Sequence, residues 1–429
     1  RMQVSRLIIE NIRKNELRLY LKSQGIEKKS DEEEQKFEEW LSDIIDNEKI
    51  DIDSINDCIW DELMYGNRRL IRVYKLKATR KIKYENAWSR FLEEFNCSGL
   101  NFNNIIQTTI SDEGENNGGE KLKVCGIKTN FENDEIKYLD ILFLYSMKIK
   151  DKLTNSLEKF YSYIPVTLDL NKKLMIIKVW NKEQADTGDT PYEQLNYVVN
   201  RIMDKFDFEI SNIIKDSQEV LYKMSKDLFN EFFISLPNSN TLDEKKCKLA
   251  EVTNLLLDGI QLENSEIVGG LKTMNKEVIN VDDELYKLIQ QIALYDYLKK
   301  NDMDSLLKNT ARYISRIRFS DIDNLTASLN SEDGKKCIFD AKTFMSIRNS
   351  LDLVKRIVTV VVSYKEHSGK GLLQVKYDAA DNRYICIHIL NNRYYNNEDF
   401  EMLWRLYEDY ESGNIANGKV CTEDDAEAI

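Results

Sequence analysis

The scarcity of chain-breaking residues constrains the fold of this sequence more than any other feature. Only 3 of its 429 residues are proline and 16 are glycine. Proline ends helices and interrupts sheet ladders, so a chain with so few breakers favours long helices and regular strands. Its 42% hydrophobic content is enough to bury a large core. The length allows roughly two or three domains.

Apolar periodicity predicts that helices and strands occupy different parts of the chain. Helical spacing in residues 4–23, 31–46 and 53–66 predicts three N-terminal helices. We favour a strand at 69–77 and a helix from Tyr84 to about Cys97. The following segments alternate or are rich in β-branched residues and are predicted to form strands: 121–129, 136–149, 311–319, 337–340 and 356–364. Two hairpins are also predicted, one over 163–180 that turns at 169–173 and one that turns at 379–382.

The remaining segments are predicted to be helical. Thr190, Pro191 and Glu193 form a capping box with proline at the first helical position, which predicts a helix from 191 to about 206. Residues 213–301 are mostly helical in pattern, and a last helix contains Phe400 to Tyr407. The predicted fold is therefore α+β. We expect a helical N-terminal module (1–66), a central mixed α/β unit with a basic segment (67–210), a helical connector (211–304), a C-terminal α/β unit with a hairpin (305–411) and a flexible tail (412–429).

A basic run from Arg68 to Lys83 is the most distinctive charge feature. It contains eight basic and no acidic residues, although the formal net charge of the chain is -13. Aromatic residues are interleaved with these cations, which is a pattern that phosphates and stacked bases would favour. The candidate nucleic-acid-binding residues are Arg68, Arg69, Arg72, Lys75, Lys77, Arg80, Lys81 and Lys83.

The segment before this run carries the opposite charge. Residues 31–62 include fourteen acidic residues and two lysines. The cations of the run could therefore neutralise the acidic helices, bind nucleic acid or bind an acidic protein partner. All three interpretations agree with the sequence. They differ in whether the basic side chains point at the acidic helices or into a groove.

Two segments of the predicted sheet resemble the metal-binding pattern of restriction endonucleases, in which an aspartate precedes (D/E)-x-K. Asp140 precedes Ser146 and Lys148, and Asp169 precedes Ile176 and Lys178. In both segments the second carboxylate is missing. Because magnesium needs such oxygen ligands, a divalent-metal nuclease is an alternative and not the main hypothesis.

The sequence predicts no catalytic residue, cofactor or metal site. Its two histidines and its seven cysteines, which form no C-x-x-C pair, lack the spacing of a zinc site or a disulfide framework. No stretch approaches the length of a membrane-spanning apolar segment, so we expect a cytoplasmic protein. The main hypothesis is a non-catalytic binding or adaptor protein for nucleic acid or nucleoprotein. A protein-only assembly subunit, acting as a homo-oligomer or with a protein partner, is a second alternative. A mobile-element or phage-defence setting is a hypothesis from composition alone.

Overall fold

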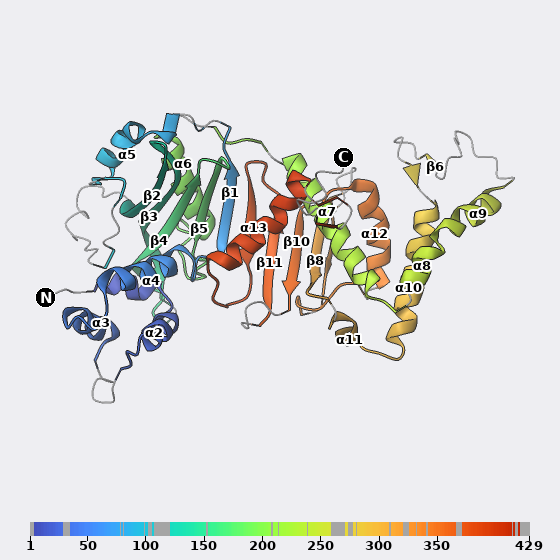
Figure 1. The fold of residues 1–429 in the computed structure, drawn as a ribbon, viewed down its shortest axis with the longest axis horizontal. Coiled ribbons are helices and arrows are strands. Elements are labelled where there is room, and N and C mark those ends of the chain that lie inside the picture. Colours follow the sequence, from blue (N-terminus) through green and yellow to red (C-terminus); the bar gives the residue numbers. More distant parts are fainter. Residues whose placement is uncertain are drawn as a thin grey trace. The chain divides into compact units, whose positions relative to one another are not determined.

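The computed structural model divides the chain into two compact units. The first comprises Arg1–Ile213 and Asn382–Leu403, and the second comprises Ile214–Asp381 and Trp404–Ile429. Each unit contains helices and an antiparallel sheet (Figure 1), so the fold is α+β as the sequence predicted. The structure describes residues 4–28, 35–77, 79, 81–97, 99–101, 105–106, 121–151, 153–206, 209–212, 214–237, 239–258, 271–272, 278–279, 281–308, 310–320, 326–331, 333–339, 342–365, 371–413, 415–416 and 419–420.

Six strands of the first unit lie side by side. Every neighbouring pair that the structure describes is antiparallel. The order is β2 (Leu122–Glu132), β3 (Glu135–Lys150), β4 (Leu157–Asp169), β5 (Leu174–Val179), β1 (Leu70–Lys75) and β12 (Tyr384–Ile389).

Tight turns fix the register of the longest strands. β2 and β3 are joined by Asn133 and Asp134, both with positive φ, which is the backbone that a two-residue hairpin turn requires. The turn between β4 and β5 is closed by Asp169, whose carboxylate accepts hydrogen bonds from the backbone N–H groups of Asn171 and Lys172. These turns place polar side chains at the ends of β2, β3 and β4.

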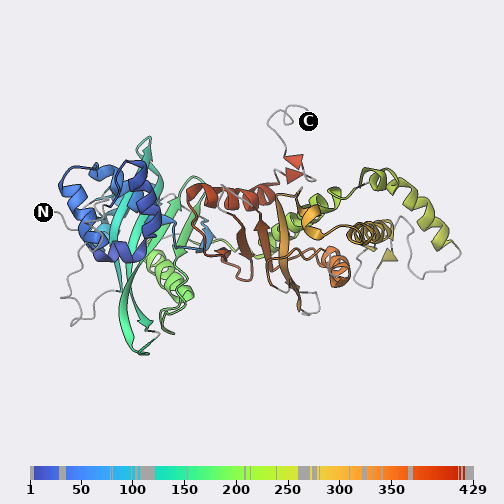
Figure 2. The same cartoon turned by 90° about the horizontal axis from the view of Figure 1, so that it is seen from below.

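The helices of the first unit cover the two faces of this sheet. They are α1 (Arg6–Asn11), α2 (Lys14–Ser23), α3 (Phe37–Asp46), α4 (Ile52–Met64), α5 (Ser89–Glu94) and α6 (Pro191–Met203), with two short 3-10 helices at Lys81–Lys83 and Glu85–Trp88. Figure 2 shows α1–α4 as one blue cluster beside the strands. α4 begins at an N-cap, Asp51, which accepts from the backbone N–H of Ser54, and α6 has the predicted capping box.

The two faces of β3 have different partners. Leu139, Ile141 and Phe143 belong to a hydrophobic core that also contains residues of α5 and α6. Tyr138 and Asp140 point to the opposite face, because successive side chains of a strand alternate. α4 packs on that face of the neighbouring strand β4. The alternation therefore places a carboxylate of β3 beneath the N-terminal helices.

The second unit contains a four-stranded antiparallel sheet and most of the long helices. Its strand order is β11 (Leu373–Asp378), β10 (Thr359–Tyr364), β8 (Arg312–Ser320) and β9 (Thr326–Asn330). The helices are α7 (Ile214–Ile234), α8 (Ser239–Glu244), α9 (Lys246–Leu257), α10 (Val281–Leu298), α11 (Met303–Leu307) and α12 (Lys342–Val354). Two-residue ladders join β6 (Leu271–Lys272) to β7 (Val278–Ile279) and β13 (Ile415–Ala416) to β14 (Lys419–Val420). α13 (Asn397–Ser412) starts in the first unit and ends in the second.

Several local predictions differ from the structure. The first predicted helix, 4–23, is two helices, because Ile12 is extended between α1 and α2. The strand predicted at 337–340 is wrong for its described residues, Cys337–Phe339, which form no strand. Among the described residues, no helix is long and apolar enough to cross a membrane.

Candidate functional site

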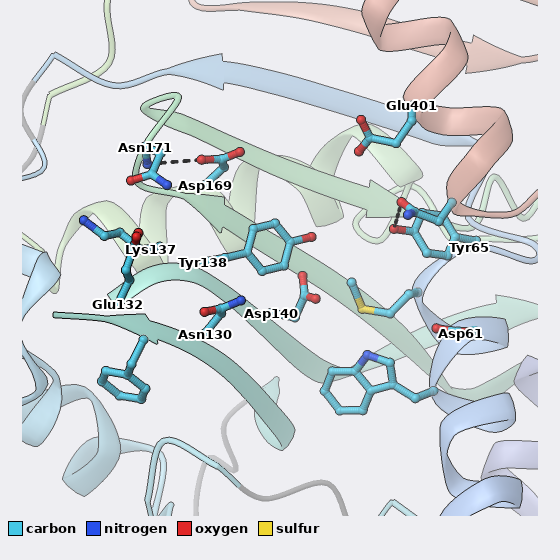
Figure 3. Close-up of a pocket in the computed structure, with 14 residues that line it drawn as sticks. Asp61, Tyr65, Asn130, Glu132, Lys137, Tyr138, Asp140, Asp169, Asn171 and Glu401 are labelled. Atoms are coloured by element: carbon cyan, nitrogen blue, oxygen red, sulfur yellow. Dashed lines mark hydrogen bonds between the residues drawn. The ribbon is translucent and has the colours of Figure 1, made fainter. Parts of the chain in front are cut away.

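A polar pocket of about 810 Å³ lies on the face of the first unit's sheet that carries Tyr138 and Asp140. Figure 3 shows these two side chains on β3 at its centre, with Asp169 and Asn171 from the β4–β5 turn at one side. At the other side lie Asp61 of α4, Tyr65 directly after that helix, and Glu401 of α13. The pocket thus combines parts of the chain that are more than 300 residues apart in sequence.

Acidic side chains dominate this pocket. Five carboxylates line it, from Asp61, Glu132, Asp140, Asp169 and Glu401, and Lys137 is the single basic side chain among its lining residues. Lys137 is itself paired with Glu135, at 3.3 Å between Nζ and Oε2. Within the described part of the chain, none of the five carboxylates forms an ion pair with a basic side chain. The lining of the pocket consequently has an excess of carboxylates over basic side chains.

Asp140 is the most enclosed of these carboxylates. Its Oδ1 accepts a hydrogen bond from Thr167 Oγ1 at 2.5 Å. Burial raises the pKa of Asp140, while the hydrogen bond from Thr167 and the charge of Lys178 oppose that rise. Partial desolvation also raises the pKa of Asp61, although its side chain is exposed at the surface, and the charge of Lys128 acts in the opposite direction. Desolvation therefore disfavours the ionised form of both carboxylates, and a cation bound beside them would stabilise that form.

A buried lysine lies behind the pocket wall. Lys178, on β5, is only 1% exposed, and its ammonium nitrogen lies 3.9 Å from the centre of the Tyr65 ring and 5.1 Å from that of Phe400. Burial lowers the pKa of Lys178 to about 8, although the charges of Asp140 and Glu401 partly offset that effect. Lys178 therefore compensates part of the charge of Asp140 without closing an ion pair with it.

Aromatic side chains form the walls at the α4 side. Trp60 packs so closely on β2 that a Cβ added at Gly126 would lie 2.5 Å from its ring. Lys128 lies over the Trp60 ring at 4.7 Å and is paired with Asp57 at 2.7 Å. The Tyr65 hydroxyl donates to Asn397 Oδ1 at 2.6 Å. These contacts fix the positions of both rings.

The structure places Arg68, the first residue of the basic run, in the interior. It is 0% exposed, and its guanidinium donates to the backbone oxygens of Asn11, Glu62 and Tyr163 and to Asn11 Oδ1. Burial lowers the pKa of Arg68 to about 10, with the Glu62 carboxylate opposing the shift. The Arg68 side chain ties α1, α4 and β4 together and has no surface on which a phosphate could bind.

The next two arginines of the run also make internal contacts. Arg72 is 3% exposed, donates from Nη1 to Asn196 Oδ1 at 2.6 Å and lies over the Tyr384 ring at 4.1 Å. Arg69 is half-buried and donates from Nη1 to the backbone oxygen of Asn391 at 2.7 Å. Burial lowers the pKa of Arg69, and the nearby charge of Arg13 lowers it further.

Lys75, Lys77 and Lys83 are more accessible than Arg68 and Arg72. Lys77 is paired with Glu209 at 3.0 Å and its side chain is 56% exposed, whereas Lys83 lies 3.5 Å from Glu135. Lys75 is partly buried. Lys81 lies in a 3-10 helix, and Arg80 is outside the described residues. The structure therefore does not gather the eight cations on one surface, and nucleic-acid binding by the run remains a prediction.

The two nuclease-like patterns are not assembled as sequence order suggested. Asp140 and Lys148 are eight residues apart on one strand, so their Cα atoms are separated by about 26 Å. Asp140 instead interacts with Lys178 of the other pattern. In the described regions no group of three or more His, Cys, Asp or Glu side chains is placed to hold a metal ion.

Sequence reasoning identified Asp140 and Asp169 but missed Asp61, Glu132 and Glu401. One signal was present, since Asp140 interrupts the apolar run of β3 and a charge there must be solvated by a pocket or by polar partners. No local signal links Asp61 or Glu401 to that strand. No family model, no curated protein and no solved structure matches this chain.

Proposed function

We propose that the chain is a non-catalytic binding protein whose first unit receives a cationic segment of a protein partner. Lysine or arginine side chains of that segment enter the pocket. The observation that carries the proposal is the set of five carboxylates around one pocket, none of them ion-paired within the described part of the chain.

The shape and chemistry of the lining support a flexible cationic side chain as the ligand. Trp60, Tyr65 and Tyr138 contribute aromatic walls. Ring faces attract ammonium and guanidinium groups, and Lys128 and Lys178 of the chain itself already lie over one face of Trp60 and of Tyr65. Carboxylates at the rim and at the base form charge-assisted hydrogen bonds with the same groups. A polyanion such as nucleic acid would be repelled by this lining.

The basic run gives less support to a nucleic-acid partner. Arg68 and Arg72 are buried and donate to internal acceptors, so they could contact phosphates only after losing those bonds. Among the members with described side chains, Lys77 is exposed, and Lys75 and Lys83 are partly buried. Of the described side chains of the run, those of these lysines would therefore make most of the contacts with a nucleic acid.

Calorimetric titration of the full chain with a tetra-lysine or tetra-arginine peptide tests the proposal. We expect the Asp61→Asn and Glu401→Gln double variant, which changes two exposed carboxylates of the pocket, to bind at least tenfold more weakly. The matched control is Glu39→Gln with Asp53→Asn, which removes the same charge from exposed positions of α3 and α4 outside the pocket. Equal weakening by both double variants would contradict the proposal, because it would show that only net charge matters.

A second titration uses double-stranded DNA, single-stranded DNA and RNA at two salt concentrations. Our account predicts no binding that depends on Lys77 or Lys83. Salt-sensitive binding that the Lys77→Glu and Lys83→Glu variant abolishes would favour the nucleic-acid hypothesis. Cleavage of these nucleic acids with magnesium or manganese, lost on Asp140→Asn, would favour the nuclease alternative.

A further inference from the structure

Helix α10 of the second unit buries three polar side chains beside Leu294 and exposes apolar ones. Its side toward the rest of the unit carries Lys287, Gln290 and Gln291, each less than 9% exposed. Lys287 is paired with Glu284 at 2.7 Å and with Asp352, and Gln290 accepts from Arg348 Nη2 at 3.0 Å. The inward contacts of α10 are therefore largely polar.

The outward side of α10 is apolar. Leu288 is 51% and Ile292 is 59% exposed. Together with Leu285 and Tyr295 they recur at spacings of three, four and three residues, which is the a/d seam of a coiled coil. A soluble helix normally buries such a stripe, so its exposure indicates a partner helix.

The neighbouring helix α9 also exposes apolar side chains. α9 contacts α10, and its residues Val252, Leu255 and Leu256 are 45%, 76% and 58% exposed. Lys246 of α9 is paired with Asp283 of α10 at 3.5 Å, which holds the two helices together at one end. We call the exposed residues Val252, Leu255, Leu256, Leu288 and Ile292 the α9–α10 face.

The charges at the two ends of α10 favour a second copy that packs in the antiparallel orientation. Acidic residues Asp282, Asp283 and Glu284 occupy its first turn, and Lys299 and Lys300 directly follow its last residue. Consider a second copy that packs antiparallel, with the two Ile292 side chains facing each other. Glu284 of one copy then lies opposite Lys300 of the other, and Leu288 of one copy packs at the level of Tyr295 of the other. A parallel copy would bring the two acidic ends together and repel.

We propose that the chain forms a two-fold symmetric dimer through the α9–α10 face, with α10 packed antiparallel against α10 of a second copy. Such an interface is isologous, since the same stripe serves both copies. The proposal concerns the second unit and is independent of the pocket in the first.

Sedimentation velocity of the full chain over a hundredfold concentration range tests the dimer. The parent should pass from monomer to dimer as concentration rises, and the Leu288→Gln and Ile292→Gln variant should stay monomeric. The matched control, Leu19→Gln with Leu157→Gln, replaces two apolar residues of the first unit that are 61% and 54% exposed and should dimerise like the parent. Circular dichroism confirms that each variant is folded.

A charge variant tests the antiparallel arrangement without changing the apolar stripe. Lys299→Glu with Lys300→Glu should weaken dimerisation at least fivefold at low salt, and the effect should shrink at high salt. A parent that is monomeric at every concentration, or a dimer unaffected by the Leu288 and Ile292 substitutions, would overturn the proposal. A dimer that the lysine variant does not weaken would refute the antiparallel pairing.

Discussion

Replacing Arg68 by methionine should cost the protein about 3 kcal/mol of unfolding free energy. The substitution removes four hydrogen bonds from a charged donor to buried oxygens. At about 1.5 kcal/mol each, the low end for charged donors, these are worth roughly 6 kcal/mol. Removing the buried charge offsets part of this loss, because burial of that charge is unfavourable and lowers the pKa of Arg68 from 12.5 to about 10. That depression corresponds to about 3 kcal/mol.

Urea denaturation at pH 7, followed by tryptophan fluorescence and circular dichroism, measures this loss. Lys77→Met is the control, because it changes an exposed cation of the same run with a single surface ion pair, worth about 0.5 kcal/mol or less. If Arg68→Met were as stable as Lys77→Met, the interpretation of Arg68 as an internal structural residue would be refuted. A variant that kept its stability but lost nucleic-acid binding would restore the original hypothesis for the run.

Three further substitutions test the surroundings of the pocket and the helix that supports its sheet. Lys178→Met should stabilise the protein by about 1–2 kcal/mol at pH 7, since burial of the charge costs more than the ring contacts return. The unfolded chain binds the Lys178 proton more tightly, so stability should rise between pH 8 and 10.5 in the parent and lack that rise in the variant, as denaturation at several pH values would show. Gly126→Ala should displace the Trp60 ring, with a shift in tryptophan fluorescence and a loss of about 1–3 kcal/mol; an unchanged spectrum and stability would contradict the close packing. Thr190→Ala should cost about 1 kcal/mol in thermal or urea unfolding through loss of the cap of α6, and a neutral result would show that the cap is not needed.

Local physics made the elements of this fold predictable. The start of α6 is predicted by Thr190, Pro191 and Glu193, because a capping box satisfies the free backbone N–H groups at the start of a helix. The alternation around Asp140 likewise indicates a strand, and the described bounds of β3 contain the predicted segment. Such signals depend only on neighbours in sequence.

The predictions that differ from the structure fail because of contacts between residues far apart in the sequence. The predicted helix 4–23 breaks after Asn11, whose side-chain amide donates to Tyr161 O at 2.7 Å and whose Oδ1 accepts from the backbone N–H of Tyr163 at 3.1 Å. No pattern in residues 4–23 shows that β4 will offer these partners. Similarly, the sequence alone suggests that Arg68 is a surface cation, because its burial depends on how α1, α4 and β4 pack around it.

The pocket was predictable only in part. Asp140 could be recognised as a carboxylate within an apolar strand, and Asp169 as a turn residue. Glu401 reaches the pocket from α13, and its position depends on how that helix packs against the sheet. The negative charge of the pocket lining could therefore not be inferred from the sequence. The most distinctive charge feature of the sequence is the basic run.

Binding of a cationic segment by the pocket is tested most sharply by comparing the affinities of the parent chain and of the Asp61→Asn and Glu401→Gln variant for tetra-lysine. We expect saturable binding of tetra-lysine by the parent, no binding of tetra-glutamate, and at least a tenfold loss of affinity for tetra-lysine in the variant. Identical affinities of parent and variant for tetra-lysine, or no binding of tetra-lysine by the parent, would contradict it.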